Sequence, residues 1–107
     1  HPLSPTTPYA ASKASSDLLV MSYYNTFTID TAIVRPFNNY GPRQNEGSYA
    51  GVIPITIERI LNGQKPIIHG DGKQTRDYIF VKDTAEAFVK VFNEKNTRGQ
   101  IINVASE

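Results

Sequence analysis

Residues 8–13 of this 107-residue chain read Pro-Tyr-Ala-Ala-Ser-Lys, and the interpretation of the whole sequence starts from this stretch. A tyrosine and a lysine four residues apart lie one turn apart on the same face of a helix. A free phenol has a pKa of roughly 10 and is a poor base near neutral pH. Because a nearby ammonium favours the phenolate, the spacing predicts that Tyr9 accepts a proton beside Lys13.

The spacing alone leaves a plainer alternative open. The chain carries six tyrosines among 107 residues, so a lysine four positions after one of them can arise by chance. Such a pair on an exposed helix face would stabilise the helix by only about 0.2–0.5 kcal/mol and would have no chemical role. Other parts of the chain have to discriminate between the two interpretations.

Composition excludes several classes of protein. A hydrophobic content of 39% with 20% charged residues is typical of a globular chain, and no apolar run approaches the roughly 20 residues of a membrane helix. The net charge of +1 gives no reason to expect nucleic acid or a membrane as a partner. The lack of cysteine is compatible with a cytoplasmic protein, and two separated histidines predict no metal site. The start at His1 and the end at Glu107 suggest a segment of a longer protein.

The pattern of apolar residues predicts an α/β fold. Thr7 followed by Pro8 indicates a helix start, and the helix is expected to reach about residue 26 with Ala10, Ala14, Leu18 and Met21 inward. Further helices are expected at 49–61, closed by Asn62-Gly63, and from 82 or 83 to 96 with Ala85, Ala87, Phe88, Val91 and Phe92 inward. Short strands are expected at 31–34, 67–68, 78–81 and 101–104, with a loop over 37–48 and a turn at 70–72.

Two polar segments are candidates for ligand binding. Residues 35–44 (Arg-Pro-Phe-Asn-Asn-Tyr-Gly-Pro-Arg-Gln) leave the carboxyl end of a predicted strand, which is where open α/β sheets bind ligands. Residues 70–78 (Gly-Asp-Gly-Lys-Gln-Thr-Arg-Asp-Tyr) place Arg76, which suits phosphate oxygens, beside Asp77, which could orient it. The alternatives are a surface turn for the first segment and a hairpin tip with an ordinary ion pair for the second. His69 is expected to pack or stack.

Four segments in this order resemble one family. They are residues 4–13, 35–43, 70–78 followed by Val-Lys-Asp at 81–83, and Asn-Val-Ala-Ser at 103–106. Together they resemble the extended short-chain dehydrogenase/reductases, specifically the nucleotide-sugar epimerases and dehydratases, with UDP-glucose 4-epimerase as the nearer branch. The resemblance implies the C-terminal portion of an NAD(P)-binding Rossmann fold. Residues 1–35 would hold its catalytic helix and following strand, 36–81 mainly the small substrate-binding lobe, and 82–107 the last helix and strand.

The resemblance implies roles for particular residues. Tyr9 would be the catalytic tyrosine, and Lys13 would bind the cofactor ribose and lower the tyrosine pKa. Pro36 and Phe37 would line the nicotinamide pocket. The family's cofactor is NAD, and the sequence leaves NADP open because the glycine-rich turn and its acidic partner are not in this chain.

The substrate implied by the resemblance is a nucleotide-diphosphate sugar. Asn38 would contact the diphosphate and Arg76 would clamp it. Residues 52–57 and 67–69 would form the base pocket, with contacts from Val52, Ile53 and His69. His69 stands where relatives often carry Tyr or Phe, and Asn-Val-Ala-Ser-Glu at the end replaces a more glycine-rich loop.

The implied reaction is transient oxidation at the sugar C4, with the tyrosinate taking the hydroxyl proton, followed by reduction from the other face. Two alternatives stay open: a 4,6-dehydratase, and a non-catalytic relative that binds NAD or a sugar nucleotide. The family also implies a homodimer through the Tyr9 helix. The 107-residue segment alone is expected to be inactive, because the family's third catalytic residue would precede His1.

Overall fold

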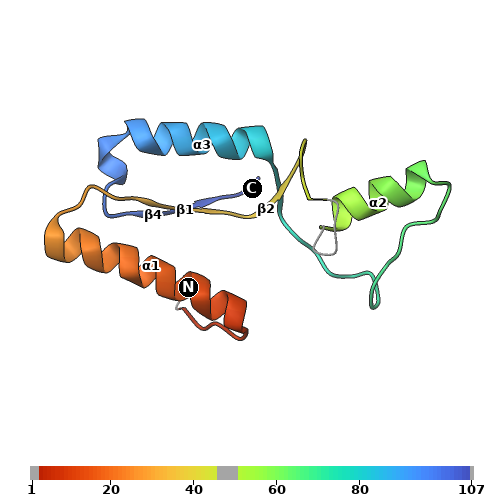
Figure 1. The fold of residues 1–107 in the computed structure, drawn as a ribbon, viewed down its shortest axis with the longest axis horizontal. Helices are drawn as coiled ribbons and strands as arrows, with labels where there is room; N and C mark the ends of the chain where they lie inside the picture. The colour runs from red at the N-terminus through yellow and green to blue at the C-terminus, as the bar shows by residue number, and fades with distance from the viewer. Residues whose placement is uncertain (1–2, 46–50, 107) are drawn as a thin grey trace. The chain divides into compact units, whose positions relative to one another are not determined.

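A computed structural model describes residues 3–45 and 51–106, and Figure 1 shows their helices and short strands. The chain divides into two compact units. The first comprises residues 1–35 and 87–103, and the second comprises residues 36–86 and 104–107. Helices alternate with short strands along the chain, so the predicted α/β class is confirmed.

The first unit begins with helix α1, Pro8–Phe27. Its N-cap is Thr7, whose hydroxyl accepts a hydrogen bond from the backbone N–H of Ala10 at 3.1 Å, and Pro8 occupies the first helical position. Both features agree with the sequence prediction, because a missing N–H costs nothing in the first turn of a helix. The helix ends at Phe27, one residue later than expected. Its C-cap Thr28 adopts a φ of 55° and donates its N–H to the Tyr24 carbonyl.

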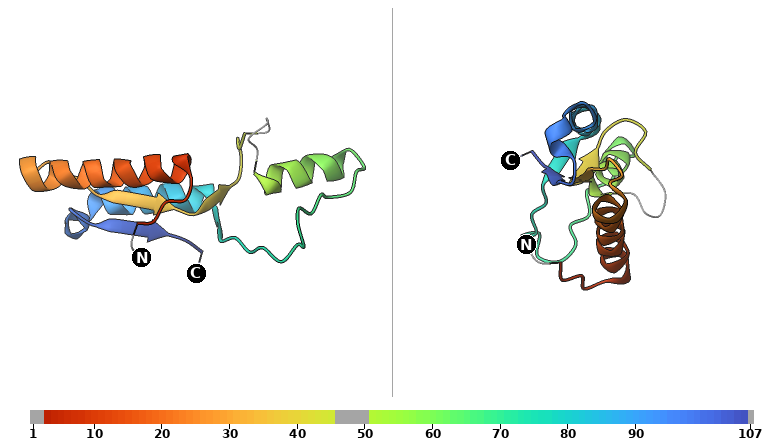
Figure 2. Two further views of the ribbon diagram at one scale, coloured as in Figure 1. Left: turned by 90° about the horizontal axis from the view of Figure 1, so that it is seen from below. Right: turned by 90° about the vertical axis from the view of Figure 1, so that its left-hand side faces the viewer.

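Strands β1, Ile33–Pro36, and β4, Ile101–Val104, form a two-stranded sheet. The Ile33 N–H donates to the Gln100 carbonyl at 3.0 Å and the Phe37 N–H to the Val104 carbonyl at 2.9 Å, so the partner numbers rise together and the strands are parallel. Helix α1 lies on one side of this pair and the C-terminal half of α3, Val81–Asn93, on the other (Figures 1 and 2). The range predicted for β4 is confirmed, whereas β1 begins two residues later than predicted.

One stripe of α1 is half-buried, and it differs from the predicted stripe at one turn. Leu18 was expected to point inward but is 62% exposed, and Asp17 takes its place. The Arg35 Nε donates to the Asp17 carboxylate at 2.7 Å, so an ion pair determines which side chain faces the sheet at this turn. The half-buried positions of α1 are Ala10, Ala11, Ala14, Asp17, Val20, Met21 and Tyr24.

The second unit contains a parallel pair that the sequence did not predict. Strand β2, Asn38–Tyr40, pairs with β3, Tyr78–Phe80, in the register Asn38 to Tyr78 through Tyr40 to Phe80. The prediction of a loop throughout 37–48 is therefore wrong at 38–40, and residues 46–48 lie outside the described part. Asn-Asn-Tyr has no apolar run, so its strand conformation depends on the distant β3 segment.

Helix α2, Val52–Leu61, begins after Gly51, and Pro54 lies in its first turn, where no N–H is needed. Asn62 ends the helix and Gly63 follows with a φ of 70°, as predicted. The predicted start at residue 49 lies outside the described residues. The predicted strand at 67–68 is wrong, because these two residues have no partner strand and Ile68 is 73% exposed.

Helix α3 begins at Val81, one residue before the earlier of the two predicted starts, 82 and 83. It ends at Asn93, before the predicted end at 96, and a 3-10 turn over Lys95–Thr97 follows it. Its inward face was only partly predicted. Ala87 and Val91 are half-buried, but Ala85 is exposed, Phe88 is 48% exposed and Phe92 is 76% exposed. Within the described residues the buried positions are Ile33, Ile79 and Thr84.

Candidate functional site

The second unit contains a hollow of about 690 Å³, which we call the main hollow. It brings together all five residues that the sequence assigned to substrate binding: Asn38, Val52, Ile53, His69 and Arg76. They come from β2, from α2 and from the segment that precedes β3, so no single stretch of sequence forms this lining. The other lining residues are Asn39, Gln44, Gly51, Ile67, Ile68, Gly72, Gln74 and Tyr78.

Arg76 and Tyr78 line the main hollow, whereas Asp77 between them does not. This alternation follows from extended backbone, in which successive side chains point to opposite faces. One Arg76 guanidinium nitrogen donates to the Thr75 carbonyl at 3.0 Å, which leaves other N–H groups of this cation for a ligand. The same period of two, applied to the sequence, would have identified Tyr78 as a lining residue.

The sequence suggested that the Asp77 carboxylate orients Arg76 directly, but this carboxylate bonds to Ser106 instead. Its Oδ1 accepts hydrogen bonds from the Ser106 hydroxyl at 2.8 Å and from the Ser106 N–H at 3.2 Å. Arg35, which belongs to the candidate binding segment 35–44, also has a partner elsewhere, because it pairs with Asp17. Both differences have the same cause, because each side chain found a partner distant in sequence.

The side-chain amides of Asn38, Asn39 and Gln44 donate hydrogen bonds to backbone carbonyls, and all three residues line the main hollow. The Asn38 Nδ2 donates to the Asp77 carbonyl at 2.9 Å, which leaves its Oδ1 as an acceptor. The Asn39 Nδ2 donates to the Phe37 carbonyl, and its Oδ1 accepts from the buried Thr84 hydroxyl at 2.5 Å. Within the described ranges the Asn38 Oδ1 therefore has no partner, whereas the Asn39 amide is held at both ends.

His69 lies just before the 70–72 turn, and its carbonyl accepts from the Gln74 Nε2 at 2.6 Å. The turn was predicted, and the Asp71 Oδ1 closes it by accepting from the Lys73 N–H at 3.1 Å. The 69–74 loop is thus folded back on itself, with the His69 side chain on the main hollow. Gln74 was not recognised from the sequence as part of this site.

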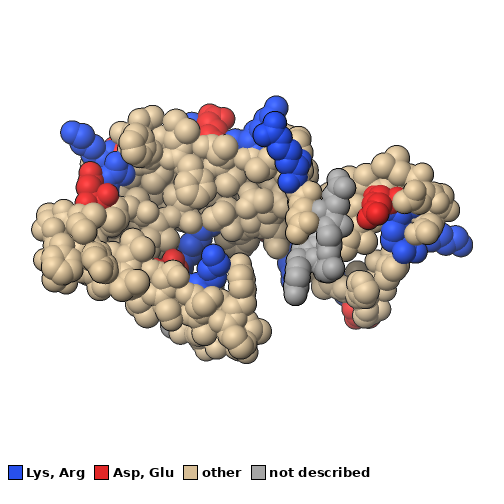
Figure 3. All heavy atoms as spheres, viewed as in Figure 1, with Lys and Arg blue, Asp and Glu red and all other residues tan. Residues whose placement is uncertain are grey.

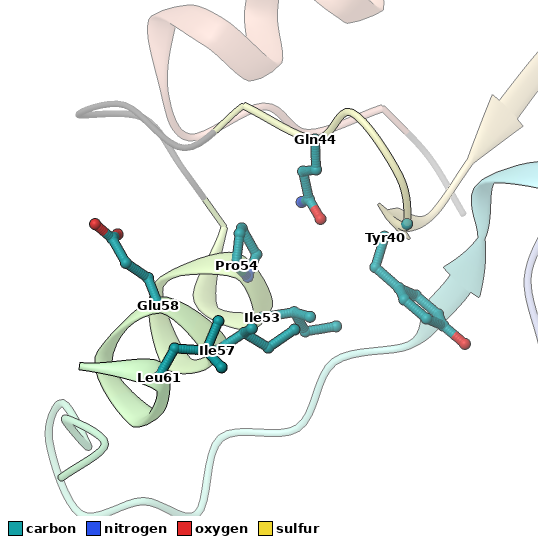
Figure 4. A pocket seen from close by; sticks show the side chains of 8 residues that line it. Tyr40, Gln44, Ile53, Pro54, Ile57, Glu58 and Leu61 are labelled. Atoms are coloured by element: carbon teal, nitrogen blue, oxygen red, sulfur yellow. The ribbon is translucent and has the colours of Figure 1, made fainter. Parts of the chain in front are cut away.

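A second, smaller hollow of about 330 Å³ is lined by α2 residues from Ile53 to Leu61 (Figure 4). In Figure 4 the side chains of Ile53, Ile57 and Leu61 project from the helix, and Tyr40 lies across the hollow from them. Positions four apart share one helical face, so Ile57 belongs to this stripe. Of residues 52–57, which the resemblance assigns to the base pocket, Val52 and Ile53 line the main hollow, and Ile53, Pro54 and Ile57 line the second one.

Tyr9 and Lys13 stand on α1 in the first unit and line neither hollow. The Lys13 Nζ lies 5.8 Å from the centre of the Tyr9 ring, so the two side chains share a face as the four-residue spacing predicts. Tyr9 is 72% exposed, so its hydroxyl is open to a ligand. Within the described residues, neither the phenol oxygen nor this ammonium has a hydrogen-bond partner, and both could therefore bind ribose or sugar hydroxyls.

Pro36 and Phe37 lie where β1 ends, at the carboxyl edge of the β1–β4 pair. The Phe37 backbone N–H donates to the Val104 carbonyl, and its ring is 45% exposed. The backbone is therefore held while the apolar ring keeps an open face. Such an edge is the general ligand-binding position of open α/β sheets.

Positive and negative side chains are mixed on the face that Figure 3 shows. In Figure 3 the Lys and Arg side chains of the described residues are scattered among Asp and Glu on the visible face, without a continuous basic band. Over residues 3–45 and 51–106, no three His, Cys, Asp or Glu side chains are grouped so as to hold a metal ion. In the same ranges, no helix combines the length and apolar character that crossing a membrane requires.

Comparison with known proteins identifies close relatives. The pattern of the NAD dependent epimerase/dehydratase family matches residues 1–105. Over 89 residues the chain is 43% identical to a UDP-glucose 4-epimerase of Mycolicibacterium smegmatis, a match that covers 83% of this chain and 28% of that enzyme.

Solved structures agree with this result. One is a UDP-N-acetylglucosamine 4-epimerase from Methanobrevibacter ruminantium in complex with UDP-N-acetylmuramic acid, with a TM-score of 0.89 and 45% identity over 95% of this chain. Another is a dTDP-glucose 4,6-dehydratase from Bacillus anthracis in complex with NAD, with a TM-score of 0.90 and 34% identity over 99% of this chain. The chain spans 33% of each of these two proteins.

Proposed function

Because the chain belongs to the NAD-dependent epimerase/dehydratase family, we propose that it supplies the sugar-nucleotide site and two catalytic residues of an NAD-dependent nucleotide-sugar 4-epimerase. The main hollow is the observation that carries this proposal. The five residues to which the sequence motifs assign substrate binding all line that one hollow, although they are spread over residues 38–76.

The chemistry of the main hollow suits a nucleotide diphosphate. The Arg76 guanidinium can make bidentate contacts with phosphate oxygens, and the free Oδ1 of Asn38 can accept a hydrogen bond from a ligand hydroxyl. Val52 and Ile53 present apolar surface to a base, and His69 offers a ring that can stack on it. The hollow is therefore cationic at one place and apolar at another, which matches the two ends of a nucleoside diphosphate.

The α1 pair suits the cofactor and the proton transfer. The Tyr9 phenol is exposed and the Lys13 ammonium lies 5.8 Å from the centre of its ring, and together they form a donor set that fits the ribose and nicotinamide side of NAD. When bound, NAD would supply the hydride acceptor. Lys13 would bind the ribose hydroxyls and, by its charge, stabilise the Tyr9 phenolate, which takes the proton of the sugar hydroxyl. Pro36 and Phe37 would give the nicotinamide an apolar wall.

The relatives support epimerases and dehydratases alike, and the epimerase is our first choice. The similar proteins include a UDP-glucose 4-epimerase at 43% identity and a dTDP-glucose 4,6-dehydratase of Actinoplanes at 46% identity. The test is a product assay on the whole protein that contains this segment, with UDP-glucose and dTDP-glucose as substrates. A C4 epimer supports the first choice, and a 4-keto-6-deoxy sugar would reject it in favour of the dehydratase.

Replacing Tyr9 by Phe tests the catalytic assignment. This change removes one oxygen and keeps the ring beside Lys13, so we expect UDP binding to stay within about twofold of the wild type. Turnover should fall by about 10²–10⁴-fold, the usual contribution of a positioned acid–base group. The matched control is Tyr23→Phe on the same helix, since Tyr23 is also exposed and should leave turnover unchanged. Equal turnover of the Tyr9→Phe and wild-type proteins would contradict the assignment.

The proposal extends to assembly through α1. Leu19, Tyr23 and Phe27 lie at successive intervals of four residues and are 59%, 46% and 64% exposed. The rings of Tyr23 and Phe27 touch, with centroids 5.4 Å apart, so this apolar stripe is continuous. We propose that it pairs two copies of the whole protein as a homodimer.

A further inference from the structure

Asp77 connects the main hollow to the chain segment after β4. Its neighbours Arg76 and Tyr78 line the hollow, and its own side chain points to the other face of the extended backbone. There the carboxylate accepts two hydrogen bonds from Ser106, a residue 29 positions further along the chain. Neither residue belongs to the lining, so this contact has no direct part in holding a ligand.

The same residue also anchors Asn38. The Asp77 carbonyl accepts from the Asn38 backbone N–H at 3.2 Å and from its side-chain Nδ2 at 2.9 Å. Asp77 therefore binds β2 through its backbone and the 104–106 segment through its side chain. That segment is itself held, because the Val104 carbonyl accepts from the Phe37 N–H at 2.9 Å. These contacts form a closed loop that joins Asp77, which follows the lining residue Arg76, to the lining residue Asn38 and to the 104–106 segment.

We propose that the Asp77–Ser106 contact is a latch that positions Arg76 toward the diphosphate of the bound sugar nucleotide. The proposal rests on the function proposed above for the main hollow. The Arg76 side chain is exposed, and its one hydrogen bond goes to the carbonyl of the preceding residue, so its direction depends on how firmly its own backbone is held. The hydrogen bonds of the latch involve a carboxylate, and such bonds are stronger than neutral ones.

Binding of UDP and of dTDP to the whole protein, measured by titration calorimetry, tests the latch. Asp77→Ala keeps the carbonyl that binds Asn38 and removes only the carboxylate, and we expect it to raise the Kd by about tenfold, as loss of hydrogen bonds to a charged group does. Ser106→Ala removes one of the two hydrogen bonds and should raise the Kd by about threefold. Ser106→Thr keeps a hydroxyl and should restore binding to within about twofold of the wild type.

A double-mutant cycle separates positioning from a general loss of structure. Arg76→Ala should weaken UDP binding by itself. If Asp77 acts through Arg76, then adding Asp77→Ala to Arg76→Ala should change the Kd by less than about twofold, because the two changes remove the same interaction. In turnover assays the latch variants should raise KM while kcat stays within about twofold, since the latch does not touch the reacting atoms.

The controls distinguish failure of the latch from failure of the proposed function. Ser22→Ala removes an exposed hydroxyl that bonds only to the Leu19 carbonyl, and should leave the Kd unchanged. If the wild-type protein binds neither UDP nor dTDP, the assignment of the main hollow is wrong and the latch proposal is overturned with it. If the wild type binds but Asp77→Ala and Ser106→Ala bind equally well, or their effects add fully to that of Arg76→Ala, the latch alone is overturned. Should Asp77→Ala fail to fold, Ser106→Ala and Ser106→Thr decide the question.

Discussion

Thr84 shows how one buried polar residue organises the second unit. It is 7% exposed, and its hydroxyl donates to the Asn39 Oδ1 at 2.5 Å. The other end of the Asn39 amide donates to the Phe37 carbonyl at 3.2 Å. A buried hydroxyl is costly without a partner, and here its partner belongs to the segment that carries the candidate diphosphate ligand Asn38. The Thr84 hydroxyl thus connects the first turn of α3 to β2 by a hydrogen bond.

Thr84→Val tests this hydrogen bond, because valine keeps the side-chain volume and removes the hydroxyl. We expect the free energy of unfolding to fall by about 1–3 kcal/mol, since the Asn39 oxygen loses its buried partner. Urea unfolding followed by circular dichroism measures the change. The matched control is Thr26→Val in α1, an exposed position where the change should stay within about 0.5 kcal/mol. Equal effects at the two positions would show that the Thr84 hydrogen bond contributes nothing.

At the scale of elements, two glycines adopt the same backbone conformation in different surroundings. Gly63 ends α2 with a φ of 70°, and a Cβ added there would meet nothing within 4 Å. Gly99 precedes β4 with a φ of 71°, and a Cβ there would lie 2.5 Å from the Tyr24 ring of α1. The Gly99 N–H also donates to the Thr31 carbonyl at 2.8 Å. Gly99 therefore has both a conformational and a packing requirement, whereas Gly63 has only the first.

Alanine at each glycine separates the two requirements. Gly63→Ala should cost about 1–2 kcal/mol of unfolding free energy, the penalty of the left-handed conformation for a residue with a Cβ. Gly99→Ala should cost the same amount plus roughly 1–3 kcal/mol, because the Tyr24 ring must move away from its place between α1 and β4. Thermal unfolding of the two variants side by side measures the difference. Equal melting temperatures of the two variants would contradict the prediction that close packing against Tyr24 adds to the cost at Gly99.

At the scale of the whole molecule, α1 presents two faces with different tasks. The stripe from Ala10 to Tyr24 covers the β1–β4 pair, and the stripe of Leu19, Tyr23 and Phe27 is exposed. An exposed apolar stripe on a helix is a common site of association between subunits. The homodimer proposed above would cover this second stripe.

Leu19→Glu combined with Tyr23→Glu tests the dimer in the whole protein. Two like charges brought together across an apolar interface oppose association, so we expect the sedimentation coefficient to fall from a dimer's to a monomer's value. Asn25→Glu is the matched control, since it adds a charge to α1 away from the exposed stripe. A wild-type protein that sediments as a monomer would contradict the proposed assembly directly, as would a dimer that survives the double substitution.

Local signals accounted for the elements that were predicted correctly. Thr7 and Pro8 begin α1, Asn62 and Gly63 end α2, and the apolar run at 101–104 forms β4. Each of these depends on residues adjacent in sequence, because capping, turn chemistry and a short apolar run act within a few positions. The four-residue spacing of Tyr9 and Lys13 is of the same kind, since a helix brings such a pair together wherever it lies.

Contacts between distant segments account for the rest. Strand β2 forms because β3 pairs with it 40 residues later. Arg35 forms an ion pair with Asp17, and the Asp77 carboxylate accepts a hydrogen bond from Ser106. None of these partners is visible in a local pattern of apolar and polar residues, because hydrogen bonding across the fold depends on which segments the chain brings together. The residue types of the candidate substrate site could therefore be recognised in the sequence, whereas their position around the main hollow depends on contacts between distant segments.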